Sequence, residues 1–405
     1  MIVIQNKKDC CGCYACENVC PKDSLRLEED VEGFYYPRIN QDTCIDCHLC
    51  EKVCPVLNVE FEQEKPQTAH LIQIKDEAIR NESTSGGAFT AIARWVIKRG
   101  GVVFGAILDI DSFEVRHRWV DTEKDLGLFR NSKYVQSHID NCYQEARKCL
   151  NEGRWVCFSG TPCQIEGLHH FLRGKTYGKL LLIDVVCYGI PSPGVFKDYM
   201  RWKQQRIGGK FQKMLFREKR LSYNYTSVSI FNENPVLDYH QGVEREQFMR
   251  SFFSDMNVRP SCYDCKFKKR YRISDFTIWD CYDVKAFSKN FDENGTNRVL
   301  VHSELGEKVL NEIKEWTKEE PFEDIDNFIK DEVAMKKSVP MNLKREAFFA
   351  DYVTMPMGDL MEKWFPLTII VRMKTFLRMA AFKLGIYNEA KRTVKKLLRM
   401  NVTVR

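Results

Sequence analysis

The sequence contains no run of about 18 apolar residues, the length that a membrane-spanning helix needs. It has no apolar N-terminal stretch of the signal-peptide type, since a cysteine motif begins at Cys10. No recognised nucleic-acid-binding motif accompanies the net charge of +6. These absences predict a cytoplasmic globular protein with no nucleic-acid partner.

Cysteine is abundant, with 17 among the 405 residues. This length allows two or three domains, and a hydrophobic content of 44% is ordinary for a globular protein. The many thiols indicate a reducing compartment. Positive charge is concentrated near the C-terminus, where residues 341–405 hold 13 Lys or Arg against 5 Asp or Glu. The basic character therefore belongs to the tail.

Two cysteine runs share one spacing. The run Cys10-x2-Cys13-x2-Cys16-x3-Cys20-Pro21 recurs as Cys44-x2-Cys47-x2-Cys50-x3-Cys54-Pro55. This is the pattern of bacterial ferredoxins with two 4Fe-4S clusters, in which the fourth cysteine of each run binds the other cluster. The first cluster is therefore predicted on Cys10, Cys13, Cys16 and Cys54, and the second on Cys44, Cys47, Cys50 and Cys20. Electron transfer is the expected chemistry.

Zinc and disulfides are the alternatives for these thiols. Zinc sites prefer two separated CxxC pairs, and disulfides suit secreted chains. The complete twofold repeat favours the two clusters. Cys11, inside the first run, is expected to be an additional thiol that binds no metal.

The chain divides into three predicted regions: a dicluster ferredoxin-like domain at 1–60, a catalytic domain at 61–325, and a basic helical region at 326–405. Strands alternating with helices predict a mixed α/β or α+β fold with sites on loops at the C-terminal ends of strands. Predicted strands cover 70–74, 102–108, 113–120, 154–158 and 179–187, and predicted helices cover 88–98, 142–150 and about 164–172.

A second set of motifs follows in the middle of the chain. Thr84-Ser85-Gly86-Gly87 precedes a helix and offers free amides to an anion, although such a sequence can also be an ordinary helix start. Four further thiols could hold a third cluster, or they could be small buried hydrophobes. They are Cys163, in the sequence Gly160-Thr161-Pro162-Cys163, together with Cys187, Cys262 and Cys265.

These motifs resemble the coenzyme F-420 hydrogenase/dehydrogenase beta-subunit family, in the form associated with bacterial polysaccharide biosynthesis. The resemblance spans roughly residues 1 to 300. It rests on STSGGAFTA (83–91), SKYVQS (132–137), FSGTPCQIEGL (158–168), DVVCYGIPSP (184–193), RPSCYDCKF (259–267) and SDFTIWD (274–280). Family members are iron-sulfur flavoproteins that bind FAD and pass electrons between clusters and a hydride carrier or organic substrate.

The resemblance implies a third 4Fe-4S cluster on Cys163, Cys187, Cys262 and Cys265. It implies FAD contacts at Ser85, Gly86, Gly87, Thr90, Ser132, Lys133, Tyr134, Gly160, Thr161 and Pro162. Lys133 and Asp275 are the predicted catalytic residues, with Asp280 as a further pocket acid; surface roles are the alternative for each. The chain departs from the family at Tyr188, where many relatives have His, and at Trp279 and Cys281. The substrate pocket is therefore expected to differ.

The predicted function is electron transfer from ferredoxin, or another low-potential donor, through the clusters and FAD to a small organic or nucleotide-sugar substrate. Exopolysaccharide or cell-surface glycan synthesis is the implied context. The alternative is an electron-transfer subunit without its own substrate. The basic stretch from Trp364 to Tyr387 predicts a helix that packs in a core or an oligomer, or else lies on a membrane surface.

Overall fold

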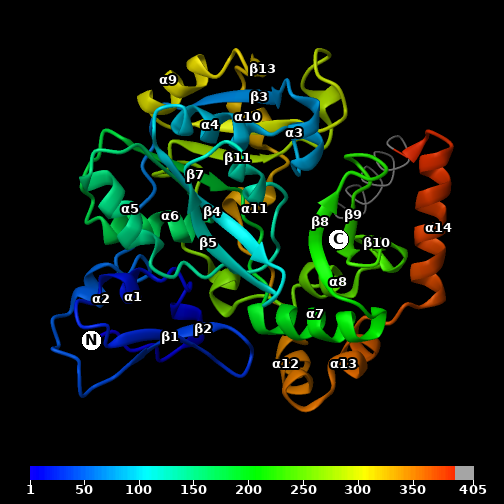
Figure 1. The fold of residues 1–405 in the computed structure, drawn as a ribbon, viewed down its shortest axis with the longest axis horizontal. Helices are drawn as coiled ribbons and strands as arrows, with labels where there is room; N and C mark the ends of the chain where they lie inside the picture. The colour runs from blue at the N-terminus through cyan, green and yellow to red at the C-terminus, as the bar shows by residue number, and fades with distance from the viewer. Residues whose placement is uncertain (388–405) are drawn as a thin grey trace, which may run out of the picture.

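The computed structural model describes residues 1–387. Three parts are visible in Figure 1: a small N-terminal module, a large central sheet with helices on both faces, and a smaller sheet flanked by C-terminal helices. The N-terminal module contains η1 (Lys7–Asp9), α1 (Ala15–Val19), β1 (Leu25–Glu29), β2 (Tyr35–Ile39) and α2 (Leu49–Lys52). Its strands form one antiparallel hairpin, so most of the module is loop.

The central sheet has eight strands in the order β13-β3-β12-β11-β7-β6-β4-β5. Its middle strands, β4, β6, β7 and β11, are parallel, and the outer strands pair antiparallel. Loops that follow the parallel strands therefore gather at one edge. The bounds are β3 (Thr68–Ile74), β4 (Val102–Asp109), β5 (Glu114–Val120), β6 (Val156–Gly160), β7 (Leu180–Val185), β11 (Phe276–Asp280), β12 (Asn297–Val301) and β13 (Thr317–Pro321).

Alternate residues of the middle strands point to opposite faces, and each face is covered by helices. Val103 and Cys157 pack in the core beneath α4, whereas Val102, Phe104 and Phe158 pack beneath α5 and α6. The helices of this part are α3 (Glu77–Glu82), α4 (Ala88–Ile97), α5 (Cys142–Asn151), α6 (Pro162–Phe171), α9 (Glu304–Glu312), α10 (Ile325–Ile329) and α11 (Val333–Lys336). Short 3-10 turns are η2 (Asp125–Phe129), η4 (Pro260–Asp264) and η5 (Val284–Ala286).

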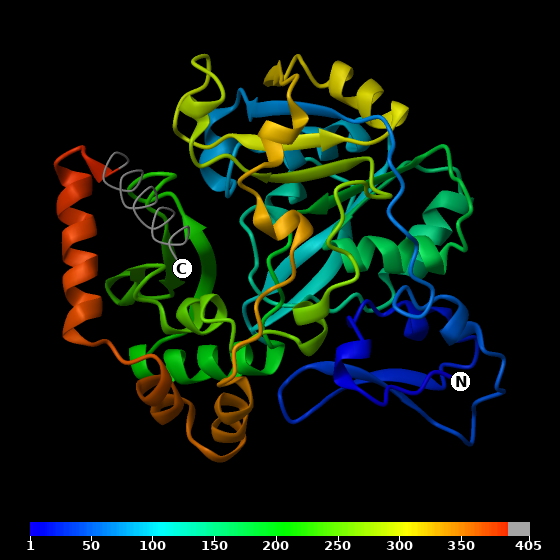
Figure 2. The same ribbon diagram turned by 180° about the vertical axis from the view of Figure 1, so that it is seen from behind.

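The N-terminal module docks on the face covered by α5 and α6, where Cys11, Cys13 and Tyr14 share a core with Ile165 and Leu168. Figure 2 shows the module beneath the sheet, joined to β3 by an extended connection. The tip of its hairpin is fixed by a bidentate ion pair between Glu32 and Arg345, at 3.1 and 2.7 Å. The module and the rest of the chain are thus in direct contact.

The smaller sheet has three antiparallel strands, β8 (Phe211–Glu218), β9 (Ser227–Asn232) and β10 (Tyr239–Gly242). Its core also contains α7 (Pro193–Ile207) and α8 (Gln247–Phe253), with η3 (Pro235–Leu237) in a loop. The C-terminal helices α12 (Arg345–Thr354) and α13 (Met357–Trp364) pack near α7, and α14 (Ile369–Lys383) stands outside β10 (Figure 1).

The predicted mixed α/β fold is confirmed, with a ferredoxin-like module before it and helices after it. The predicted strands and helices are present within about two residues at most ends. The β8–β10 sheet and the β1–β2 hairpin were not predicted. The predicted helical region at 326–405 extends beyond Tyr387, so its last part is outside the described residues. Among residues 1–387, no helix is long and apolar enough to span a bilayer.

Candidate functional site

The first predicted thiol group, Cys10, Cys13, Cys16 and Cys54, is brought together by the fold. Burial, together with the nearby Cys13 and Cys10, raises the pKa of Cys54 to about 12. Burial raises the pKa of Cys16 well above its usual value, and Cys13, Cys10 and Cys54 add to that rise. Cys54 therefore approaches the first cysteine run although it belongs to the second, as cross-ligation requires.

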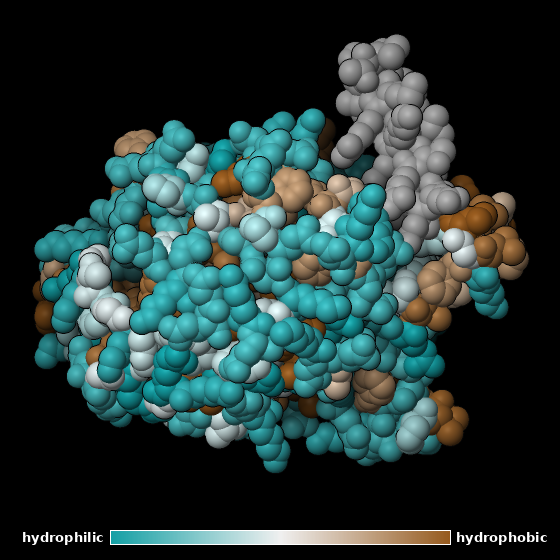
Figure 3. Space-filling model, turned by 90° about the horizontal axis from the view of Figure 1, so that it is seen from above, coloured by the Kyte–Doolittle hydropathy of each residue, from teal (hydrophilic) through white to brown (hydrophobic). Residues whose placement is uncertain are grey.

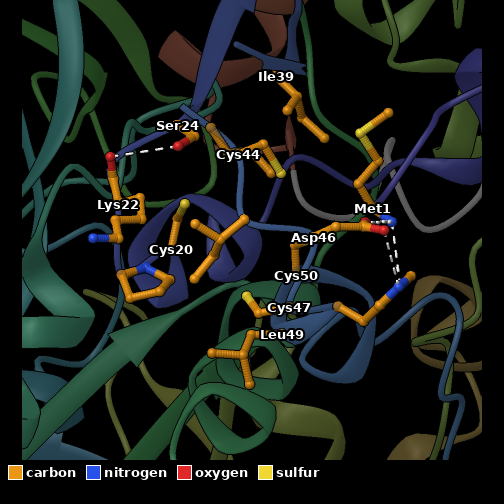
Figure 4. A pocket seen from close by; sticks show the side chains of 14 residues that line it. Met1, Cys20, Lys22, Ser24, Ile39, Cys44, Asp46, Cys47, Leu49 and Cys50 are labelled. Atoms are coloured by element: carbon orange, nitrogen blue, oxygen red, sulfur yellow. Dashed lines mark hydrogen bonds and ion pairs between the residues drawn. The ribbon is translucent and has the colours of Figure 1, made fainter. Parts of the chain in front are cut away.

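The second group also gathers in one place. Cys20, Cys44, Cys47 and Cys50 line a single pocket with Met1 and Pro21, and their side chains surround a common space (Figure 4). The backbone amide of Ile2 donates to Cys50 Sγ at 3.4 Å. Within residues 1–387, no three His, Cys, Asp or Glu side chains are arranged to share one metal ion. A cubane requires a different arrangement, since its four thiolates bind four separate irons.

The third group comes from three separate loops. Cys163 is in the first turn of α6, Cys187 follows β7, and Cys262 and Cys265 belong to η4 and its C-cap. Burial raises the pKa of Cys187 to about 12, with contributions from Cys163 and Cys265. Burial also raises the pKa of Cys262, and the other three thiols add to it. All four thiols are thus close enough to interact.

Cys11 lies between the first and third groups. Hydrogen bonds to Cys13 and Cys163 hold the pKa of Cys11 well above its usual value. The same contact with Cys11 lowers the pKa of Cys163 to about 7. The close approach also involves Gly167 of α6, where an added Cβ would come within 2.9 Å of the Cys13 Cβ. The first and third groups are therefore neighbours, which the spacing of the cysteines did not reveal.

A buried arginine, Arg259, lies close to Cys10 of the first thiol group and Cys262 of the third. Arg259 is fully buried and donates from Nε to the Cys10 carbonyl at 2.8 Å and from a terminal nitrogen to the Tyr35 carbonyl at 2.9 Å. That terminal nitrogen also lies 3.5 Å from Cys10 Sγ. The other terminal nitrogen donates to Gln136 Oε1 at 2.9 Å, and Gln136 in turn donates to the carbonyls of Cys11 and Gly12. One guanidinium thus fixes the backbone of the first cysteine run.

A cavity of about 480 Å³ lies at the edge where the parallel strands end. It is lined by the loops after β6, β7 and β11, and on its other side by Phe252 and Phe253 of α8. Eight of the ten predicted FAD contacts line it: Ser85, Gly87, Thr90, Ser132, Lys133, Tyr134, Gly160 and Thr161. Cys187 lines it as well, so the third thiol group and the cavity share a wall.

Gly86, Pro162 and Asp275 are not part of the cavity wall. An added Cβ on Gly86 would come 2.4 Å from the Ile72 carbonyl oxygen, so this glycine permits backbone packing. Pro162 is buried at the first position of α6. Asp275 precedes β11, and its carboxylate accepts from the Leu182 amide at 2.7 Å and from the Ser303 hydroxyl. Asp280, at the opposite end of β11, does line the cavity, as does Glu332.

Asp280 is held in an ion pair that the sequence did not predict. Arg217 of β8 donates to its carboxylate at 2.5 Å, and the Tyr223 hydroxyl donates at 3.2 Å. Burial acts to raise the pKa of Asp280, but Arg217 and the hydrogen bonds outweigh it and leave the pKa below its usual value. Asp280 is therefore an anion beside the cavity. No spacing signal links residues 217 and 280, which lie on different sheets.

The Ser85 and Lys133 loops contact each other at the cavity. Gly87 has a φ of +82° and caps the N-terminus of α4, and the Ser132 amide donates to Thr84 Oγ1 at 2.7 Å. Lys133 Nζ donates to the carbonyls of Leu128 and Arg130, both at 2.9 Å. Burial lowers the pKa of Lys133 to about 7. A helix start and a partly desolvated amine therefore face one space, a combination suited to an anion.

Two segments of the chain match known families. Residues 9–58 match the 4Fe-4S dicluster domain. Residues 153–324 match the C-terminal part of the coenzyme F420 hydrogenase/dehydrogenase beta subunit. This second matched segment contains all four thiols of the third group but not the Ser85 and Lys133 loops. The resemblance predicted from the sequence is confirmed for these segments, and the polysaccharide association stays a prediction.

No curated protein matches the chain. Among solved structures, a chain of the F420-reducing NiFe hydrogenase complex from Methanosarcina barkeri is similar, with 14% identity and a TM-score of 0.42. The matched region covers 75% of this chain and 93% of that chain. The match to the dicluster domain identifies this chain as an iron-sulfur electron-transfer protein.

Proposed function

We propose that the protein is an iron-sulfur flavoprotein oxidoreductase that carries electrons from its N-terminal clusters, through a third 4Fe-4S cluster, to FAD in the cavity. The observation that carries this proposal is the position of Cys187. It belongs to the third thiol group and also lines the cavity. A cluster held there would be next to any cofactor in the cavity.

The order of the thiol groups supports the same route. Cys11 contacts both Cys13 of the first group and Cys163 of the third. Cys50 of the second group is near Cys16 of the first. Electrons from ferredoxin, or another low-potential donor, would pass from the second group to the first and then to the third.

The lining of the cavity and its volume, which is that of a small-molecule site, support FAD as the proposed cofactor. The cavity volume of about 480 Å³ is within the range of ligand sites, about 300–1,000 Å³. The start of α4 and Lys133 would hold the phosphates, and the Tyr134, Tyr188, Phe252 and Phe253 rings would pack against the flavin. When bound, FAD exchanges two electrons with an organic substrate and single electrons with a cluster. Asp280 and Arg217 would orient polar groups of the substrate.

The substrate class follows from the resemblance rather than from the cavity. A small organic molecule or a nucleotide sugar of cell-surface glycan synthesis is our proposal, in a cytoplasmic setting. An electron-transfer subunit without its own substrate is the second candidate, supported by the match to a hydrogenase/dehydrogenase beta subunit. Reduction of a substrate by the isolated chain with dithionite would separate the two candidates.

Anaerobic reconstitution tests the cofactor content. The protein should take up about twelve iron atoms and about one FAD per chain, read by iron analysis and by the flavin absorption spectrum. About eight iron atoms would remove the third cluster. A fully iron-loaded protein that binds no flavin would eliminate the flavoenzyme and leave the electron carrier.

FAD affinity should depend on pH through Lys133. Its pKa of about 7 in the free protein means that the charge is present below pH 7 and is lost as pH rises. A bound pyrophosphate raises that pKa, so binding takes up a proton and weakens as pH rises above about 7. For a rise of one pKa unit, the dissociation constant should increase about tenfold by about pH 9. Flavin fluorescence quenching measures this.

The matched variants are Lys133→Met and Lys124→Met, the latter at an exposed lysine outside the cavity. Lys133→Met should bind FAD weakly and with a flat pH profile, and Lys124→Met should behave like the wild type. An unchanged pH dependence in Lys133→Met would contradict the assignment of Lys133 to the phosphates.

A further inference from the structure

Helix α14 presents an apolar stripe to solvent. Ile369, Met373, Phe376 and Leu377 are 76, 58, 72 and 62% exposed, and Leu384 beyond the helix is 73% exposed. Their spacing of three or four residues places them on one side of the helix. Soluble proteins rarely leave so many large apolar side chains together in water, and such patches usually mark interaction sites.

The opposite side of α14 is already occupied. Phe382 stacks on Tyr225 with a centroid distance of 6.0 Å, and Arg378 forms an ion pair with Glu244 at 3.6 Å. These contacts hold the helix against the loops around β9 and β10 and turn its apolar stripe outward. Figure 3 shows hydrophobic side chains gathered at this side of the molecule. The helix therefore does not pack in a core by that stripe within the described residues.

The charge around the stripe is of one sign. Arg372, Lys374 and Lys383 are exposed, and residues 366–387 contain no Asp or Glu. In sequence, the last 40 residues, 366–405, hold ten Lys or Arg and one acidic residue. Apolar side chains flanked by lysine and arginine are what an anionic lipid surface accommodates, since the cations reach the headgroups while the apolar groups enter the interface.

We propose that α14 attaches the protein to the surface of an anionic lipid bilayer, with the helix lying in the interface. A second copy of the chain fits this stripe less well. In a twofold dimer the same face meets itself, which would bring these cations together without a carboxylate from the same segment. The attachment does not involve the cavity, so the proposal is independent of the flavin.

Vesicle flotation of the complete, cluster-loaded chain tests the proposal. Vesicles of phosphatidylcholine with phosphatidylglycerol should carry the protein at low salt, and vesicles of phosphatidylcholine alone should carry much less. Combining Ile369→Gln, Met373→Gln, Phe376→Gln and Leu377→Gln should weaken flotation about tenfold or more. Arg372→Gln with Lys374→Gln should weaken the preference for the anionic vesicles, since two of the cations beside the stripe are lost.

The control is Val236→Gln with Leu343→Gln, at apolar residues that are 88 and 93% exposed elsewhere on the molecule. It should float like the wild type, and cluster absorbance should be the same in all variants. The proposal is overturned if the wild type does not float, or if the α14 quadruple variant floats equally well. Light scattering that shows a dimer lost in that variant, with no vesicle binding, would assign the stripe to a second copy.

Discussion

Replacing Cys163 by alanine should reduce the iron content from about twelve to about eight atoms per chain. Cys163 interacts with Cys187, Cys262 and Cys265 but is not part of the N-terminal groups, so only the third cluster should be lost. Iron analysis and electron paramagnetic resonance of the reduced protein would show the loss of one cluster signal. Flavin reduction by dithionite-reduced N-terminal clusters should slow at the same time.

The matched control is Cys149→Ala, at a buried cysteine on α5 that belongs to none of the three groups. It should retain all the iron. Loss of all iron in Cys163→Ala would show that the partition of the thiols is wrong. Unchanged iron in that variant would show that Cys163 is not a ligand.

Replacing Arg259 by leucine should lower the free energy of unfolding by about 3–9 kcal/mol, the sum for three buried groups that lose their donor. The reason is that the carbonyls of Cys10 and Tyr35 and the Gln136 side chain would lose their donor in a fully buried site, at about 1–3 kcal/mol for each stranded group. Loss of the cation beside Cys10 should also shift the reduction potential of the first cluster to a more negative value. Anaerobic urea denaturation and a redox titration measure the two effects.

Two further variants separate charge from geometry. Arg259→Lys keeps the charge but not the planar fork of donors. The reduction potential of the first cluster should therefore stay close to that of the wild type, whereas the free energy of unfolding should still fall. Arg201→Leu, at an exposed arginine on α7, should change neither. If Arg259→Leu unfolds like the wild type, the guanidinium does not stabilise the module. If it leaves the potential unchanged, the guanidinium does not tune the cluster.

Local patterns predicted much of the fold. The cysteine runs are short and repetitive, and ligand spacing within a few residues is decided by loop geometry rather than by the rest of the chain. Buried strands such as β4 and β7 are visible because parallel strands covered on both faces are continuously apolar. The β8–β10 sheet escaped prediction because its strands carry a mixed pattern, with Lys213, Arg217 and Glu218 among apolar residues.

The candidate site was predictable in its parts but not in its assembly. Ser85, Lys133 and Thr161 line one cavity, and their predicted common role in binding FAD came from the family resemblance rather than from a local pattern. Asp275 precedes β11 and Asp280 ends it, and the rule that sites lie at the carboxyl ends of parallel strands would have favoured Asp280 if residues 276–280 had been predicted as a strand. The Arg217–Asp280 pair depends on the contact between two sheets, which no local pattern describes.

The sequence by itself determined the two N-terminal cluster motifs, the alternation of strands and helices, and the basic tail, because each depends on residues close together in the chain. Only the tertiary structure decided that Cys163, Cys187, Cys262 and Cys265 converge, because they lie on loops that become neighbours when β6 and β7 pair and η4 folds against them. It also decided that Cys11 and Arg259 join the first and third groups. Proximity between distant segments is set by packing, and packing is not encoded in local spacing.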